Sequence, residues 1–161
     1  MINTEIHSMQ IEQAVLAALM TVSESFAQVE NLLTEDDFHA TRHKLIFKAV
    51  VDLDSKNSPY DAVLINQWIE THGFSEAVGG EKYLMQILGD APSSFYNLIS
   101  YAEKLKDLTA CRKVESVAQK IILNARSLTV SRGDLVFNAQ AAFAEINTEQ
   151  SSESLFHIHE A

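Results

Sequence analysis

Apolar residues recur at intervals of three and four along most of this chain, which is the spacing of one buried face of an α-helix. The first run follows Ser8, whose hydroxyl can cap a helix, and continues through Ile11, Val15 and Leu19. Further runs of this kind predict helices over residues 25–33, 41–55, 61–72 and 81–88. Together these elements predict a head of several short helices packed around one core.

A much longer helical stretch follows the head. Apolar positions fall near one stripe from Leu98 to Ala125, and neither glycine nor proline interrupts the chain before Gly133. A helix of about 30 residues is roughly 45 Å long, more than a small head can cover. Ser131 and Asp134 form a capping signal for a second helix, so the two helices are expected to make an antiparallel hairpin. Such a hairpin shields only part of its apolar surface, and the remainder predicts a partner.

The fold class that follows is all-α, a globular multi-helix head followed by an antiparallel helical hairpin. We place the head at residues 7–96 and the hairpin at residues 97–147. The polar run "NTEQSSES", residues 147–154, predicts that residues 148–161 form the flexible start of a linker. Only five glycines and two prolines occur in 161 residues, which favours long helices over a β fold with many turns.

Two adjacent glycines, Gly79 and Gly80, stand beside Lys82 and raise the question of a phosphate-binding loop. A P-loop requires a lysine directly after its last glycine, then Ser or Thr, normally after a buried strand. Here Lys82 follows Gly80 at two residues, no Ser or Thr comes after it, and no strand is predicted. We therefore expect the glycines to supply a tight turn with positive φ between two helices. No ATP-binding motif is found, and we expect no cofactor in this chain.

The charge is negative overall and unevenly distributed. A formal net charge of −10 argues against a dedicated grip on duplex DNA, which requires clustered cations. Residues 1–41 contain seven acidic residues and no Lys or Arg, whereas residues 104–132 contain seven basic residues and two acidic ones. One interpretation is simply that solvated helix faces carry unequal charge. The alternative is that the basic segment meets an acidic surface, which another copy of the chain could provide.

Candidate catalytic and metal-binding residues are few. His39 and His43 lie four apart, as in a two-histidine metal face, but the run "HATRH" lacks the glutamate of HExxH, and a capped acidic turn is the favoured interpretation. Cys111 has no histidine nearby and is expected to be an inert, packed thiol. No stretch approaches the roughly 18 apolar residues of a membrane helix and no signal peptide opens the chain, so we expect a soluble cytoplasmic protein.

Several segments occur in the order seen in one known family. They are "HSMQIEQAVLAALM", "EDDFHATRHKLIFKAV", "PYDAVLINQWIETHGFSEAVGGEKYLMQI" and "APSSFYNLISYAEKLKD". This series resembles the N-terminal domain of bacterial replicative DNA helicases of the DnaB type. The resemblance covers roughly residues 7–147, and the glycine pair is one of its markers.

The resemblance implies a function in DNA replication. In this family the domain dimerises through its hairpins, and three dimers form a collar on a hexameric ring that encircles DNA. The collar is the docking place of the C-terminal domain of primase, and a helicase loader is a further possible partner. A linker leads to a motor domain that uses ATP and Mg²⁺ and moves 5′ to 3′. That motor is absent from the sequence, so this fragment is expected to have no enzymatic activity of its own.

The expected surface for self-association and partner docking lies on the hairpin, where apolar residues act as anchors and Arg112 fixes the register. Its predicted residues are Leu105, Leu108, Arg112, Val117, Ile121, Val136 and Phe143. Ordinary packing within the hairpin is the alternative for each of them. For the whole chain, a free-standing helical adaptor that binds a protein partner is the second hypothesis, and a small metalloenzyme using His39 and His43 is the third.

Overall fold

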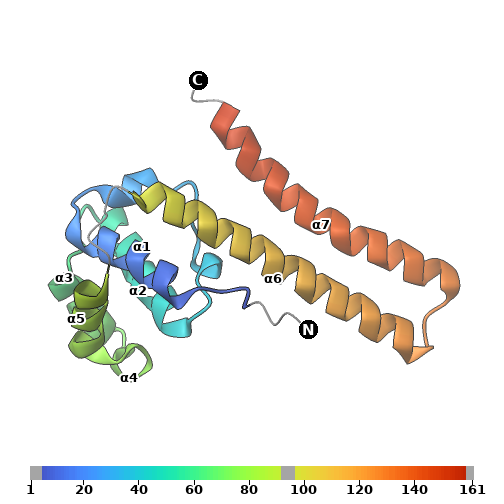
Figure 1. The fold of residues 1–161 in the computed structure, drawn as a ribbon, viewed down its shortest axis with the longest axis horizontal. Coiled ribbons are helices and arrows are strands. Elements are labelled where there is room, and N and C mark those ends of the chain that lie inside the picture. The colour runs from blue at the N-terminus through green and yellow to red at the C-terminus, as the bar shows by residue number, and fades with distance from the viewer. Residues whose placement is uncertain (1–4, 92–96, 159–161) are drawn as a thin grey trace. The chain divides into compact units, whose positions relative to one another are not determined.

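The structure is a computed structural model, and it describes residues 5–91 and 97–158, with side chains up to residue 146. The chain divides into two compact units, Met1–Thr109 and Ala110–Ala161. All regular elements in the described ranges are helices, which agrees with the predicted all-α class (Figure 1). No helix among the described residues has the length and apolarity needed to cross a bilayer. Residues 92–96, with the Pro92 and Ser93 of a quoted segment, lie outside these ranges.

The described residues of the first unit form five complete α-helices and the beginning of a sixth. In chain order they are α1 (Met9–Thr21), α2 (Thr41–Ser55), α3 (Ala62–Thr71), α4 (Ser75–Val78), α5 (Gly80–Asp90) and α6 (Leu98–Ser127). Two 3₁₀ turns, η1 (Ser25–Gln28) and η2 (Glu35–Asp37), connect α1 to α2. Helix α2 packs against α1, α3 and α4, and α5 packs against α1 and α3.

Several helix ends coincide with capping signals in the sequence. The Ser8 hydroxyl accepts a hydrogen bond from the Ile11 backbone N–H at 3.3 Å, which confirms it as the cap of α1. Asp61 Oδ1 caps α3 by accepting from the backbone N–H groups of residues 63 and 64, each at 3.0 Å. These side chains satisfy amides that have no partner inside the first helical turn.

The glycine pair forms the expected bend. Gly79 has φ +99° and ends α4, and Gly80 has φ +63° and begins α5. Residues with a Cβ rarely adopt this left-handed region, so the glycines are required by the turn. A Cβ at position 79 would also stand 3.2 Å from the Cβ of Tyr83. The prediction of a turn between two head helices is confirmed.

The helix predicted over residues 25–33 was wrong. Only η1 forms there, followed by turns through Leu33. Phe26, Val29 and Leu33 are all buried, so the apolar pattern was read correctly as a buried segment. The Phe26 backbone N–H donates to the hydroxyl of Tyr60 at 3.1 Å, a partner 34 residues away that no local pattern discloses.

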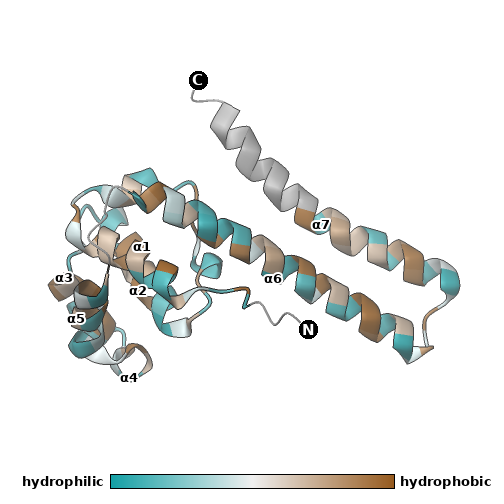
Figure 2. Cartoon of the chain, viewed as in Figure 1, coloured by the Kyte–Doolittle hydropathy of each residue, from teal (hydrophilic) through white to brown (hydrophobic). Residues whose placement is uncertain are grey.

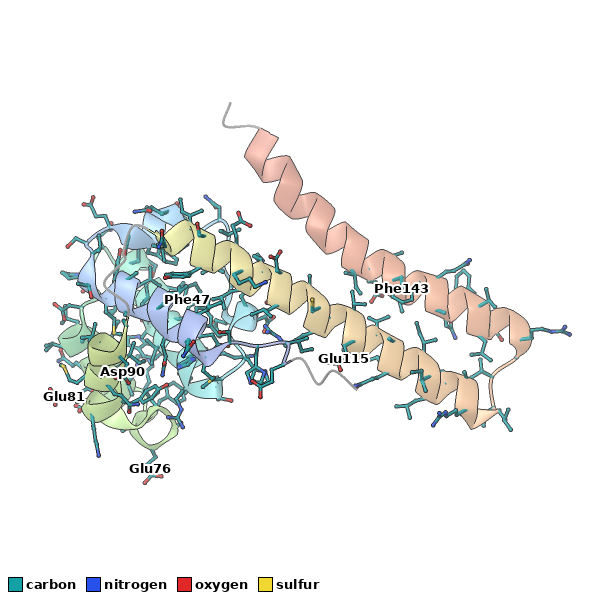
Figure 3. The ribbon with its side chains drawn as sticks, in the orientation of Figure 1. Phe47, Glu76, Glu81, Asp90, Glu115 and Phe143 are labelled. Carbon is teal, nitrogen blue, oxygen red and sulfur yellow. The ribbon has the colours of Figure 1, made fainter. Side chains whose placement is uncertain are left out.

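The core of the first unit is built from large aliphatic and aromatic side chains. Phe47 of α2, labelled in Figure 3, is 1% exposed. It packs against Phe26 and Phe38, with ring centroids 5.9 Å and 4.9 Å away. Each such side chain contributes about 1.5–3 kcal/mol when removed from water. Other fully buried residues are Leu16, Leu19, Ile46, Ile65, Ile69, Leu84 and Ile87.

The first turns of α6 belong to this core. Leu98, Ala102 and Leu105 are buried, and Lys106 Nζ lies 3.4 Å from a carboxylate oxygen of the buried Asp37. The division between the two units therefore falls within α6, after Thr109, whereas our head–hairpin boundary at residue 96 marks the beginning of that helix.

The second unit consists of the rest of α6 and of α7 (Arg132–Ile158), which run in opposite directions from a short turn (Figure 1). Ser131 accepts from the Asp134 backbone N–H at 3.2 Å and donates to its carboxylate, so the predicted capping signal is confirmed. Helix α7 continues to Ile158, past residue 147, where we expected the folded region to end. A linker beginning at residue 148 stays a prediction.

Candidate interaction surface

The second unit has no buried core among its described side chains. From residue 110 to residue 146, every side chain is at least partly exposed to solvent. Large apolar groups are among the exposed ones, and brown, hydrophobic segments follow both helices in Figure 2. They are Val114, Ile122, Leu123, Leu128, Val136, Phe137 and Phe143. Several large apolar side chains exposed on one small unit favour an interaction site over an ordinary monomer surface.

On α7, two apolar faces can be distinguished by burial. Leu135, Ala139 and Ile146 are partly buried at spacings of four and seven residues, which indicates the face directed at α6. Val136 and Phe143 lie seven residues apart on a neighbouring face and are 58% and 43% exposed. Phe143 is labelled on α7 in Figure 3. The second face is left without a partner within the described part of the unit.

On α6, the corresponding stripe is less exposed. Val117 and Ile121 are half-buried, whereas Val114 is 46% and Ile122 is 50% exposed. Their spacing of three and four residues places Val114, Val117 and Ile121 on one side of the helix. The apolar stripe of α6 is therefore wider than the part that is half-buried. Ile122, next to Ile121 in sequence, lies at the exposed edge of the stripe.

The seven residues predicted for self-association are not all equally placed. Leu105 is fully buried in the core of the first unit, so it cannot face a partner in this fold, and its prediction as an interface residue is corrected. Leu108 is half-buried in the same unit, and Arg112 is half-buried and already engages another group. Val136 and Phe143 are the most accessible of the seven, and their role in association stays a prediction.

The predicted surface leaves out five of the exposed apolar residues. Val114 and Ile122 lie on or beside the α6 stripe and could have been included from their spacing. Leu123 and Phe137 fall outside the main stripes of α6 and α7, and they are each 68% exposed. The sequence could have indicated these two residues, because each is an apolar residue outside the apolar stripe of its helix. Leu128 lies in the turn, where helical periodicity cannot predict whether a side chain is buried or exposed.

Cys111 was expected to be packed, but its side chain is exposed on α6. It lies in the hairpin helix, and no element covers that position among the described residues. The expectation of a packed thiol is therefore corrected.

A buried polar network lies inside the first unit. Glu12 of α1 and His43 of α2 are both fully buried, and His43 Nδ1 lies 2.5 Å from Glu12 Oε2. Glu12 also accepts from the backbone N–H groups of His39 at 2.8 Å and Ala40 at 3.3 Å. On the far side of the ring, His43 Nε2 lies 2.7 Å from the hydroxyl of Tyr83. Every polar atom named here has a partner, as buried polar groups require.

The network holds Glu12 as a carboxylate. Burial alone opposes ionisation and raises the pKa of this carboxyl, but the hydrogen bond from His43, those from the two backbone amides and the attraction of the imidazole outweigh burial. The pKa of Glu12 accordingly lies below its ordinary value. Both nitrogens of His43 are engaged, and the ring of His39 stacks on His7 with centroids 4.2 Å apart. This arrangement is structural and does not present His39 and His43 to one metal ion.

Known protein sequences include clear relatives of this chain. Residues 4–107 match the family described as DnaB-like helicase N terminal domain. The replicative DNA helicase DnaB of Haemophilus influenzae is 31% identical over 121 residues, which is 75% of this chain and 26% of that protein. Replicative DNA helicase DnaB of Buchnera aphidicola is 30% identical over 116 residues, 72% of this chain and 25% of that protein. The chain spans about a quarter of the length of these relatives.

Two solved structures share the fold. The crystal structure of the N-terminal domain of DnaB helicase from Mycobacterium tuberculosis superposes with a TM-score of 0.81 at 22% identity, covering 89% of this chain and 99% of that one. A DnaB-like replicative helicase, described with its interactions with primase, gives a TM-score of 0.68 at 23% identity, covering 96% of this chain and 35% of that one. At this level of identity the likeness establishes the all-helical fold.

Proposed function

Because this chain belongs to the family of DnaB-like helicase N-terminal domains, we propose that it is the self-association and primase-docking module of a replicative DNA helicase. The first unit is a stable helical head, and the hairpin of the second unit is the surface through which copies of the chain associate. In the assembled protein, paired domains would form a collar of three dimers on a hexameric ring.

The observation that carries this proposal is the lack of a buried core from residue 110 to residue 146. A two-helix unit with exposed valine, isoleucine, leucine and phenylalanine gains little from the hydrophobic effect by itself. Covering that face with a second copy removes apolar area from water at about 25 cal/mol per Å². Self-association would therefore stabilise this part of the chain by removing its apolar side chains from water.

The parent protein's activities belong to a part outside this chain. The matched relatives are about three times as long, and we assign an ATP- and Mg²⁺-dependent motor and translocation along DNA to the remainder. The fragment itself is proposed to have no catalytic site and to act in the cytoplasm. Primase is the partner we favour for the docking surface, since one helicase of the same fold is described with primase interactions. A loader protein is a further candidate partner.

A free-standing adaptor without a motor is the second candidate function. It would use the same exposed hairpin face for a different protein, so the structure of the fragment fits both proposals. The two differ in the coding sequence, since a helicase continues past Ala161 into a segment with a P-loop. Reading the downstream sequence separates them directly.

Self-association is tested by measuring molar mass with light scattering over a wide range of concentrations. We expect a mass near twice 17.9 kDa that falls on dilution. Replacing both Val136 and Phe143 with Glu places charges on the exposed α7 face and should leave a helical monomer. Asn138→Glu adds a charge on another exposed part of α7 and should associate like the wild type. A wild-type monomer at every concentration would contradict the proposal for the isolated domain.

A further inference from the structure

A cleft in the first unit has no role in the function proposed above. It lies between the end of α1 with the turn that follows and the end of α2 with the turn that leads to α3, and its volume is about 520 Å³. Leu19, Met20 and Tyr60 contribute buried apolar side chains to its wall. Among the described residues that line it, none is Lys, Arg or His. The cleft therefore combines an apolar wall with a negative rim.

Three carboxylates form that rim, namely Glu24, Asp54 and Asp61. Asp61 is engaged in capping α3, but neither Glu24 nor Asp54 has an ion pair within the described part of the chain. Asp54 belongs to the last turn of α2, where the partial negative charge of the helix end adds to its own. A ligand that fits this cleft has an apolar group flanked by positive charges.

The turn between α6 and α7 presents that combination. Leu128 lies in this turn, and its side chain is 90% exposed to solvent. Arg126 and Arg132 flank it in sequence, and both are exposed. The surrounding segment, residues 110–132, contains five basic residues and one acidic residue, whereas residues 1–109 contain sixteen acidic and seven basic residues. We call Arg126, Leu128 and Arg132 the hairpin tip.

We propose that the hairpin tip of one copy docks into the acidic cleft of a second copy, with Leu128 against the apolar wall and the two arginines facing Glu24 and Asp54. This inference rests on the self-association proposed above and specifies its orientation. With two-fold symmetry, each copy inserts its tip into the cleft of the other, and both contacts form in one closed dimer. Complementary charge at the two ends would set partner choice and register, while the apolar hairpin faces contribute the buried area.

The chain connectivity favours an antiparallel pairing of hairpins in such a dimer. Helix α6 begins in the first unit and ends at the tip, and its stretch within the second unit, 110–127, rises about 27 Å. When two such hairpins pair antiparallel, each tip lies beside residue 110 of the partner's α6, where that helix continues into the partner's first unit. A parallel pairing would place the two basic tips side by side and make them repel each other.

The test reverses charge on each side of the contact separately. The tip-reversed variant carries Arg126→Glu and Arg132→Glu, and the cleft-reversed variant carries Glu24→Lys and Asp54→Lys. Asp61 is left unchanged because it caps α3. Sedimentation equilibrium measures the dimer dissociation constant, and circular dichroism shows whether each variant remains folded. Each variant alone is expected to dissociate at least about tenfold more readily, since both contacts in its dimer become repulsive.

An equimolar mixture of the two variants is the decisive sample. In the mixed dimer, the reversed tip of one copy faces the reversed cleft of the other, and the two unchanged sides face each other. Both contacts are then attractive, and we expect the mixture to associate as tightly as the wild type. Glu76→Lys with Glu81→Lys changes the net charge as the cleft reversal does, at exposed residues that do not line the cleft (Figure 3). This control should keep the wild-type dissociation constant.

Three outcomes overturn the inference. The separate variants could keep the wild-type constant, the mixture could associate no more tightly than its components, or the Glu76 and Glu81 control could weaken association equally. In all three the wild type still associates, so the proposed function survives. A wild-type monomer at every concentration overturns both, which keeps the two failures distinguishable.

Discussion

His43 Nδ1 lies 2.5 Å from Glu12 Oε2, and the two side chains are fully buried although they are 31 residues apart in sequence. The contact joins α1 to α2, and through the hydroxyl of Tyr83 it extends to α5. Because the Glu12 carboxylate can only accept, His43 donates to it through Nδ1–H. The amide of Gln13 then donates to the Tyr83 oxygen at 3.2 Å. Three helices of the head are thereby connected by polar contacts inside an apolar core.

Replacing Glu12 with Gln should destabilise the head. Glu12 accepts from two backbone amides and from His43, and an amide group has only one acceptor oxygen for these donors. A buried donor left without a partner costs about 1–3 kcal/mol, and we expect a loss of that size in the free energy of unfolding. Urea denaturation followed by circular dichroism measures it. Glu30→Gln, at an exposed position, is the matched control and should leave stability unchanged.

The stability of the head should depend on pH through Glu12. The pKa of this carboxyl is lower in the folded protein than its ordinary value of 4.5, so the unfolded chain binds the proton more readily. The contribution to stability is therefore complete above that value and is lost as the pH falls through the lower, folded pKa. Denaturation midpoints between about pH 6 and pH 3 measure this dependence. In Glu12→Gln the curve should be flatter, and an unchanged slope would contradict the assignment.

Replacing Gly79 with Ala should destabilise the turn between α4 and α5. The backbone at this position has φ +99°, and a Cβ would stand 3.2 Å from the Cβ of Tyr83. We expect a loss of about 1–3 kcal/mol in the free energy of unfolding. Gly133 provides the comparison, since it lies in α7 with no atom within 4 Å of a built Cβ, and Gly133→Ala should be neutral or slightly stabilising. Equal effects at the two positions would contradict this account.

Replacing Ile121 with Glu should abolish self-association without unfolding the chain. Ile121 is half-buried on the α6 stripe, and a charge there would have to be desolvated when a second copy covers the stripe. We expect a helical monomer by circular dichroism and light scattering at concentrations where the wild type is dimeric. Asn124→Glu introduces the same charge at an exposed position of α6 and should still associate. Loss of association in both variants would show that added charge, rather than this face, is responsible.

Much of the local structure follows from short-range patterns. The cap at Ser8, the helix over Thr41–Ser55, the helix that begins beside Asp61 and the turn at Gly79 were all predicted and are found in the structure. Each depends on groups within about four residues of one another, such as a hydroxyl and an unpaired amide. The general division into a many-helix head and a long hairpin is readable for the same reason, because helical periodicity repeats over short intervals.

Contacts between distant residues were not readable from the sequence. The stretch over residues 25–33 has helical spacing, but Tyr60 accepts the Phe26 amide and only a 3₁₀ turn forms. Glutamate is a residue type usually found at the surface, so the sequence gives no sign that Glu12 is buried. Its burial is favourable only because His43 of another helix donates a hydrogen bond to it.

The sequence by itself determined the fold class, most helix limits, the glycine turn and the family, because these depend on local spacing and on residues in a recognisable order. The tertiary structure alone decided which apolar residues of the long helices are covered. Leu105 and Ile122 both lie on or beside the apolar stripe of α6, but the head covers the first and nothing described covers the second. Periodicity identifies a face, whereas burial depends on what other part of the protein packs against it.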